Sequence, residues 1–248
     1  MKTRNIVILL CIAASAAACS SEKEIRLMSY NVNNCFGMDS TLNRQRIADI
    51  IMAENPDVVA LQQLDSMTAR FPAYTLGELA AATLMNAVYG PSGQVEGGKT
   101  GVGILSKEKP VSTRIVQLPG GGEGSVMLIA EFKKFCFASA TMSRSQGDQI
   151  ASVAIIKEAA ANAGKPFFFG GSLNARYGSQ TVSSLARDFT ALTNISARTY
   201  PADQPISLVD YLFMYNHNLR DFTIDNVAVL NEPVASDHRP VVAKLSFR

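Results

Sequence analysis

The sequence predicts a single α/β domain built on mixed β-sheets. Short apolar runs of strand length alternate along the chain with longer segments whose apolar residues recur at helical spacing. In the middle of the chain, two strand-like segments flank a glycine-rich turn and predict an antiparallel hairpin, whereas the helices elsewhere predict crossover connections. With 248 residues, 47% of them apolar and 18% charged, the chain is long enough to bury a substantial core.

The first half of the domain predicts strands and helices in alternation. The first strand alternates apolar and polar residues and ends in two asparagines. The helix after it carries Leu42, Ile47 and Ile51 at helical spacing, and it ends before Pro56 because the residue before a proline disfavours the helical region. The elements expected here are strands at residues 25–32, 58–61 and 101–106 and helices at residues 41–54 and 76–86.

The second half begins with the hairpin and continues with further strands and helices. The turn at residues 119–124 is rich in glycine, but it does not precede a helix and lacks a P-loop lysine, so a hairpin connection is favoured over a phosphate-binding loop. A later helix carries Ile150, Val153 and Ile156 as an apolar stripe. The elements expected here are strands at residues 111–116, 125–132, 135–141, 166–170, 208–215, 222–230 and 240–246 and helices at residues 149–163 and 182–189.

Residues 1–18 predict a targeting segment that takes no part in the fold. Lys2 and Arg4 precede a short apolar stretch, and small residues then lead to Cys19. This order resembles a bacterial lipoprotein signal, with cleavage before Cys19 and lipid attached to its thiol, although Ala16 stands where such signals usually carry leucine. The alternative is a plain secretory signal followed by an incidental cysteine. We expect an exported protein tethered by Cys19 to a membrane of the bacterial cell envelope, with residues 19–24 as a spacer and residues 25–248 as one domain.

The charge of the mature chain argues against nucleic acid as a partner. Two of the 23 basic residues, Lys2 and Arg4, lie in the targeting segment, so the rest of the chain carries 21 basic and 21 acidic side chains. Nucleic-acid binding depends mainly on neutralisation of phosphates by basic residues, and this sequence contains no basic run.

Two cysteines, Cys35 and Cys136, remain in the domain once Cys11 and Cys19 are set aside. Cys35 follows the first strand and Cys136 begins another, so strands that point toward one rim would place the two thiols roughly 20 Å apart. We therefore expect two separate thiols rather than a disulfide bond.

Polar residues at the strand ends carry the most information about function, because catalytic groups tend to lie where a rigid scaffold ends. The segments concerned are Tyr30-Asn31-Val32, Leu61-Gln62-Gln63, Gly170-Gly171-Ser172-Leu173-Asn174, Val209-Asp210-Tyr211 and Ser236-Asp237-His238-Arg239-Pro240. Together with the run from Pro56 to Gln62, they make residues 25–248 resemble the endonuclease/exonuclease/phosphatase superfamily. The resemblance implies a four-layer sandwich, with two mixed sheets packed face to face and helices outside. It also implies a metal-dependent phosphoric ester hydrolase that uses Mg²⁺ or Mn²⁺.

Several positions depart from the pattern of that family. Gln63 stands where the family carries a glutamate that holds the metal, so an amide oxygen replaces an anionic ligand. Ser172 stands where an aspartate helps to deprotonate the attacking water, and an alcohol is a far weaker base. Thr141 and Thr100 occupy positions where many members carry histidine and tyrosine. We therefore expect metal binding to be weak or absent.

Other positions keep the residues of the family. Asn31, Asn174, Asp210, Asp237 and His238 match the catalytic pattern, and the resemblance places Gln63, Asn31 and Asp237 nearest the metal. In active members the final histidine stabilises the charge that develops on phosphate, and the carboxylate at position 210 orients its ring. Each retained residue also has a structural alternative: Asn31 could cap a turn, and Asp210 with His238 could be a buried pair that steadies the sheet.

These residues favour a catalytically impaired or inactive homologue that binds a ligand or partner at the former active-site cleft. A phosphate-containing small molecule and an unidentified protein are both compatible with that expectation. The alternatives are a residual Mg²⁺- or Mn²⁺-dependent hydrolase that uses Asp237, His238 and Asn174, and a surface lipoprotein whose interactions do not involve the cleft.

Overall fold

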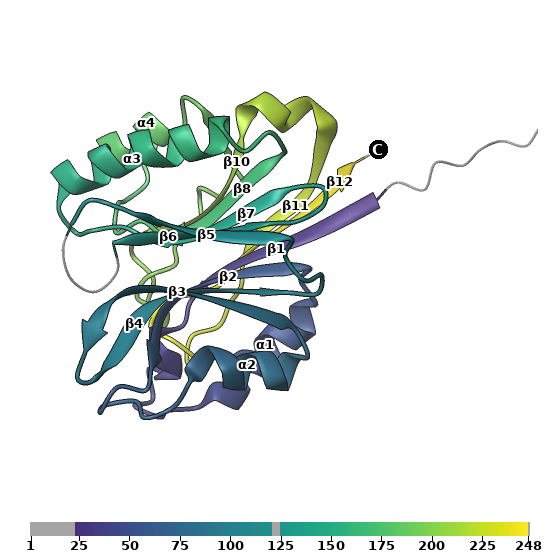
Figure 1. Cartoon of the computed structure of the whole chain (residues 1–248). Helices are drawn as coiled ribbons and strands as arrows, with labels where there is room; N and C mark the ends of the chain where they lie inside the picture. Colours follow the sequence, from purple (N-terminus) through teal and green to yellow (C-terminus); the bar gives the residue numbers. More distant parts are fainter. Residues whose placement is uncertain (1–22, 121–124, 248) are drawn as a thin grey trace, which may run out of the picture.

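The computed structural model describes residues 23–120 and 125–247, and they form two β-sheets packed face to face with helices outside (Figure 1). The predicted targeting segment, the lipid acceptor Cys19 and part of the glycine-rich turn lie outside these residues. Within the described part of the chain no helix is long and apolar enough to cross a membrane.

The first sheet contains six strands in the order β11-β12-β1-β2-β4-β3. In chain order these are β1 (Lys23–Asn31), β2 (Val58–Ser66), β3 (Asn86–Val95), β4 (Gly98–Ser106), β11 (Phe222–Val229) and β12 (Val241–Phe247). Strands β1 and β2 run parallel, joined through α1 (Arg44–Glu54), and the other neighbours run antiparallel. The expected mixture of parallel and antiparallel pairing is confirmed.

The second sheet also contains six strands, in the order β5-β6-β7-β8-β10-β9. In chain order these are β5 (Ser112–Gln117), β6 (Val126–Glu131), β7 (Cys136–Thr141), β8 (Phe167–Ser172), β9 (Phe189–Ala191) and β10 (Asp210–Tyr215). Strands β5 and β6 form the predicted antiparallel hairpin, and β7 pairs in parallel with β8 through the crossover helix α3 (Gln146–Ala161).

Helices cover the outer face of each sheet, which completes the predicted four-layer sandwich (Figure 1). Helices α1 and α2 (Thr75–Thr83) lie against the first sheet, and α3 and α4 (Gln180–Leu185) lie against the second (Figure 1). Two short 3₁₀ helices, η1 (Asn33–Cys35) and η2 (Asn216–Asp221), follow β1 and β10.

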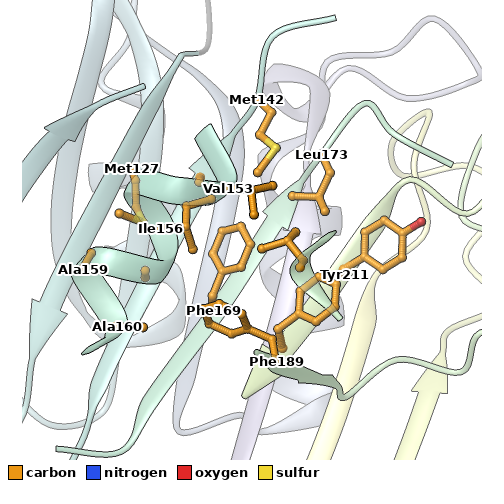
Figure 2. Packing of buried hydrophobic residues seen from close by; sticks show 14 of the residues in the cluster. Met127, Met142, Val153, Ile156, Ala159, Ala160, Phe169, Leu173, Phe189 and Tyr211 are labelled. Carbon is orange, nitrogen blue, oxygen red and sulfur yellow. The ribbon is translucent and has the colours of Figure 1, made fainter. Parts of the chain in front are cut away.

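Three apolar clusters fill the spaces between the four layers. One lies between the two sheets and another beneath α1 and α2. The third packs α3 and α4 against the second sheet, where Ile156 meets Phe169 (Figure 2). The two sheets approach closely at Gly170, because a Cβ added there would lie 2.8 Å from Cβ of Ala60. This close approach fixes the position of the strand ends that carry the polar residues.

Several element boundaries differ from the expectations. The first helix begins at Arg44 rather than residue 41, because the side chain of Asn43 caps it by accepting a hydrogen bond from the backbone N–H of Arg46. Leu42 therefore lies outside the helix and is 39% exposed. The first strand begins at Lys23, so the last two residues of the predicted spacer belong to the sheet.

Strands β3 and β9 were missed. Strand β3 contains Gly90, Pro91 and Gly93, which weaken a strand pattern in sequence. The fold tolerates them because β3 lies at the edge of its sheet and has a register irregularity between Pro91 and Gly93. Strand β9 has three residues and occupies the edge of the other sheet beside β10.

The expectation of separate thiols is confirmed. Cys35 and Cys136 are both free and buried. Burial raises the pKa of the Cys35 thiol to about 12, and burial also raises the pKa of Cys136.

Candidate functional site

The site lies at one rim of the sandwich, where strand ends from both sheets meet. In the second sheet, Thr141 at the end of β7 pairs with Ser172 at the end of β8, and Ser172 pairs in turn with Asp210 at the start of β10. Residues directly opposite one another in a sheet point to the same face. Ser139, two residues before Thr141, donates a hydrogen bond to the carbonyl of Leu61 in the other sheet, so this face looks into the space between the sheets.

His238 is held by residues from both sheets. Its Nδ1 lies 2.7 Å from Oδ2 of Asp210, and its Nε2 lies 3.4 Å from Nδ2 of Asn31. The carboxylate accepts the Nδ1–H, so in the neutral imidazole Nε2 carries the lone pair that faces the Asn31 amide. The ring of Tyr200 lies with its centroid 4.7 Å from that of the imidazole. The side chains of Asp210 and His238 are 0% and 7% exposed, which makes this a buried pair.

The loop that carries Asp237 and His238 is fixed by its own hydrogen bonds. Oγ of Ser236 donates to the carbonyl of Asn31 at 2.8 Å, which joins the loop to the end of β1. The carbonyl of Asp237 accepts from the backbone N–H of Ala202, also at 2.8 Å. The backbone at Asp237 is therefore held in place, and Oδ1 of its carboxylate lies 3.9 Å from Nε2 of His238.

Burial and neighbouring charge perturb both titrating groups of this loop. Burial opposes the charged form of His238, but the charge and hydrogen bond of Asp210, together with the charge of Asp237, outweigh it and raise the pKa of the imidazole. Burial raises the pKa of the Asp237 carboxyl group, and the charge of Asp210 adds to this, while His238 acts in the opposite direction. The site therefore stabilises the protonated imidazole more than water does and makes Asp237 a weaker acid than usual.

Gln63 was expected at the end of its strand, but it lies within the strand. Strand β2 continues to Ser66, and its pairing with β4 shifts between Leu61 and Leu64. Gln63 adopts a φ of 55° inside this irregularity, which is an uncommon backbone conformation for a residue with a side chain. The bulge directs the half-buried Gln63 side chain toward a cavity, whereas Gln62 beside it is buried between the sheets and donates to Ser139.

A cavity of about 720 Å³ opens at this rim. Its walls combine side-chain amides, hydroxyl groups, two phenylalanine rings, two arginines and one carboxylate. The lining residues are Asn33, Asn34, Phe36, Gln63, Arg70, Phe71, Thr100, Gly101, Ser125, Thr141, Met142, Ser143, Arg144, Asn174 and Asp237.

The structure divides the predicted site residues into two sets. Gln63, Thr100, Thr141, Asn174 and Asp237 line the cavity. The second set consists of buried residues that do not line it, namely Asn31, Ser172, Asp210 and His238. Ser172 is 1% exposed, and its hydroxyl oxygen has no hydrogen-bond partner in the described residues.

Sequence reasoning missed several residues of the cavity wall. Arg70 and Phe71 follow β2 in a connection that carries no motif, and Arg144 follows β7. The buried carboxylate of Asp65 was also missed; it forms an ion pair with Arg70, with Oδ2 2.7 Å from Nε. The nearest signal in the sequence was the pair Asn33-Asn34 at the end of the first strand, and both residues line the cavity.

The residues present do not fit a Mg²⁺ or Mn²⁺ ion. These hard cations prefer anionic oxygen ligands. Asp237 is the one carboxylate that lines the cavity, and Gln63 contributes a neutral amide. Across residues 23–120 and 125–247, no group of three or more histidine, cysteine, aspartate or glutamate side chains could hold a metal ion.

Comparisons with known proteins give the same picture of the fold. The sequence profile of the Endonuclease/Exonuclease/phosphatase family matches residues 28–238. No curated protein sequence matches the chain. Among solved structures, a family protein from Bacteroides thetaiotaomicron is 16% identical with a TM-score of 0.75, covering 92% of this chain and 99% of that one.

Two further solved structures resemble this one. A mannosyl-6-phosphatase from Bacteroides thetaiotaomicron is 16% identical with a TM-score of 0.72, covering 90% of this chain and 100% of that one. The human Nocturnin catalytic domain with a bound sulfate anion is 17% identical with a TM-score of 0.70, covering 92% of this chain and 97% of that one. At these identities the likeness concerns the fold.

Proposed function

Because the chain belongs to the endonuclease/exonuclease/phosphatase family, we propose that it is a catalytically impaired phosphoesterase homologue that binds a phosphate-containing small molecule in the cavity at the rim. The observation that carries this proposal is the pair Gln63 and Ser172. These residues stand where the family pattern places the metal-binding glutamate and the aspartate that handles the attacking water.

The surroundings of these two residues support impaired catalysis. A serine hydroxyl is a poor general base near neutral pH, and loss of a positioned base alone costs roughly 10²–10⁴-fold in rate. Ser172 is also buried and does not line the cavity. Gln63 faces the cavity, but it brings no charge that could hold a divalent cation.

The chemistry of the walls supports a phosphate-containing ligand. Amide, hydroxyl and guanidinium groups line the cavity, and all of them can donate hydrogen bonds to phosphoryl oxygens. Two structural relatives are described as a phosphatase of a sugar phosphate and as a protein with bound sulfate, a close mimic of phosphate. We further propose that the protein is exported and tethered to the cell envelope through Cys19.

Hydrolysis assays on the purified protein test the proposal. p-Nitrophenyl phosphate and bis(p-nitrophenyl) phosphate serve as monoester and diester substrates, each with Mg²⁺ or Mn²⁺. We expect turnover far below the roughly 1 s⁻¹ of an ordinary enzyme. The same protein should bind a phosphate monoester in calorimetry. Turnover at ordinary enzymatic rates, or failure to bind any phosphate-containing probe, contradicts the proposal.

A residual hydrolase is the second candidate. The intact contacts of His238 with Asp210 and Asn31 favour it, since they hold the imidazole beside Asp237, which lines the cavity. This candidate predicts slow turnover that disappears in His238→Ala. Slow turnover that persists in that variant excludes it and points to a contaminating enzyme.

A further inference from the structure

Three charged side chains line the cavity, and they differ in the groups that lie beside their charges. Arg70 donates from Nε to Oδ2 of Asp65 at 2.7 Å and from Nη2 to Oδ1 at 3.3 Å, and Asp65 is fully buried. Asp237 is the one carboxylate in the wall, and its Oδ1 lies 3.9 Å from Nε2 of His238. Arg144 is exposed, and in the described part of the chain no acidic side chain forms an ion pair with it.

The backbone that carries Arg144 is held firmly although its side chain is exposed. Oγ of Ser143 donates to Oδ2 of Asp148 at 2.9 Å and accepts from the backbone N–H of Ser145 at 3.1 Å. Nε2 of Gln149 donates to the carbonyl oxygens of Ser143 and Asn174, at 2.9 and 3.2 Å. The turn that bears Arg144 is thus tied to the loop after β8.

A second bond joins the same two walls of the cavity. Nδ2 of Asn174 donates to the carbonyl of Met142 at 2.7 Å. Asn174 itself adopts a φ of 51°, which places it in the left-handed region at the end of β8. The guanidinium of Arg144 therefore starts from a fixed base beside Asn174, and only its side-chain torsions remain to be ordered when a ligand binds.

The cavity wall also carries neutral side chains that can donate hydrogen bonds. Within the described residues no hydrogen bond occupies the side chains of Gln63, Thr100 or Thr141, and all three line the cavity. These groups can solvate phosphoryl oxygens, but they carry no charge. A phosphate monoester dianion in this cavity needs positive charge from elsewhere, and the donor set does not supply it through a divalent cation.

We propose that Arg144 supplies this charge, so that the cavity binds the phosphoryl group of a phosphate monoester directly and without a divalent cation. The inference rests on the proposed function and names the charged group that would replace the metal. A planar guanidinium suits the task because it donates two parallel hydrogen bonds to a pair of phosphoryl oxygens. Phe36 and Phe71 in the walls can contact an apolar or ring-shaped part of the ligand.

Calorimetry with phenyl phosphate tests the inference, once in EDTA and once with Mg²⁺. We expect binding in EDTA that Mg²⁺ does not strengthen, and weaker binding of benzoate, which has a single negative charge. Arg144→Gln should weaken phenyl phosphate binding about tenfold or more, because it removes a charge-assisted hydrogen bond. Arg144→Lys keeps the charge but loses the paired donors, so its affinity for phenyl phosphate should lie between those of the unchanged protein and Arg144→Gln.

Arg187→Gln is the matched control, since Arg187 is an exposed arginine that does not line the cavity. It should bind phenyl phosphate like the unchanged protein. Binding that requires Mg²⁺, or Arg144→Gln binding as tightly as the control, overturns the inference while leaving the proposed function standing. If phenyl phosphate binds under neither condition, the inference is overturned, and the proposed function falls only if every other phosphate-containing probe fails to bind as well.

Discussion

Replacement of Asp210 by asparagine should reveal that the Asp210–His238 pair is a charged unit buried in the fold. Oδ2 of Asp210 lies 2.7 Å from Nδ1 of His238, and the two side chains are 0% and 7% exposed. Breaking a buried ion pair by removing one partner costs about 3–5 kcal/mol. Asparagine keeps the shape and one acceptor oxygen, so we expect the lower end, about 3 kcal/mol. For a domain of this size that corresponds to a fall in Tm of about 6–12 °C.

The pH dependence gives the stricter test of the same pair. The pKa of His238 is raised in the folded protein, so folding is favoured by the protonated imidazole. The stability from this linkage is fully present below the unfolded histidine pKa of about 6.5, and it is lost as the pH rises through the higher folded pKa. In Asp210→Asn the folded pKa falls, and this pH-dependent loss should shrink.

Urea denaturation between pH 5.5 and 9 measures both effects. Asp188→Asn is the matched control, because Asp188 forms an ion pair with Lys157 at the surface. The side chain of Lys157 is 50% exposed and that of Asp188 is 30% exposed. A surface pair of this kind contributes about 0–1 kcal/mol. If Asp210→Asn costs no more than this control and keeps the pH dependence of the unchanged protein, the reasoning about a buried charged pair is refuted.

Three further predictions concern the site and its scaffold. Without metal, the double variant Gln63→Glu with Ser172→Asp should be less stable than the unchanged protein by on the order of 3 kcal/mol, because it adds buried carboxylate charge. Mn²⁺ should raise the Tm of the variant and leave the Tm of the unchanged protein as it is. A rise in the Tm of both proteins would contradict this. Gly170→Ala should cost about 1–3 kcal/mol in urea denaturation by overpacking the sheets, and a neutral result would show that the sheets can move apart. Cys35 and Cys136 should react with a thiol reagent only after unfolding, since both are buried; rapid labelling of the folded protein would count against this.

Much of the fold could be predicted because its central strands are long apolar runs with polar ends. Strands such as β8 are buried along their whole length, and a run of three phenylalanines marks that in the sequence. Edge strands have a weaker sequence pattern. Strand β3 forms because β4 offers a partner along one side, and its glycines and Pro91 give no local sign of that partner.

The candidate site could be predicted in part, because the sequence does not show which residues become neighbours when the chain folds. Motifs at strand ends identified Asp210 and His238, which the structure places 2.7 Å apart although they are 28 residues apart in the chain. Whether a residue lines the cavity or lies beneath it depends on strand register, and the bulge at Gln63 has no sequence signal. Arg144 lines the cavity because β7, which it follows, lies beside β8, and this pairing is known only from the structure.

The direction of β1 has a consequence for how a ligand would reach the protein. This strand starts at Lys23, four residues after the proposed lipid acceptor Cys19, and ends at Asn31 in the candidate site. Nine residues of strand span about 30 Å. A tether at Cys19 would hold the start of β1 near the bilayer and place the candidate site at the far end of that strand. The protein would then sample the aqueous side, and its ligands would arrive as dissolved molecules rather than by lateral diffusion in the lipid.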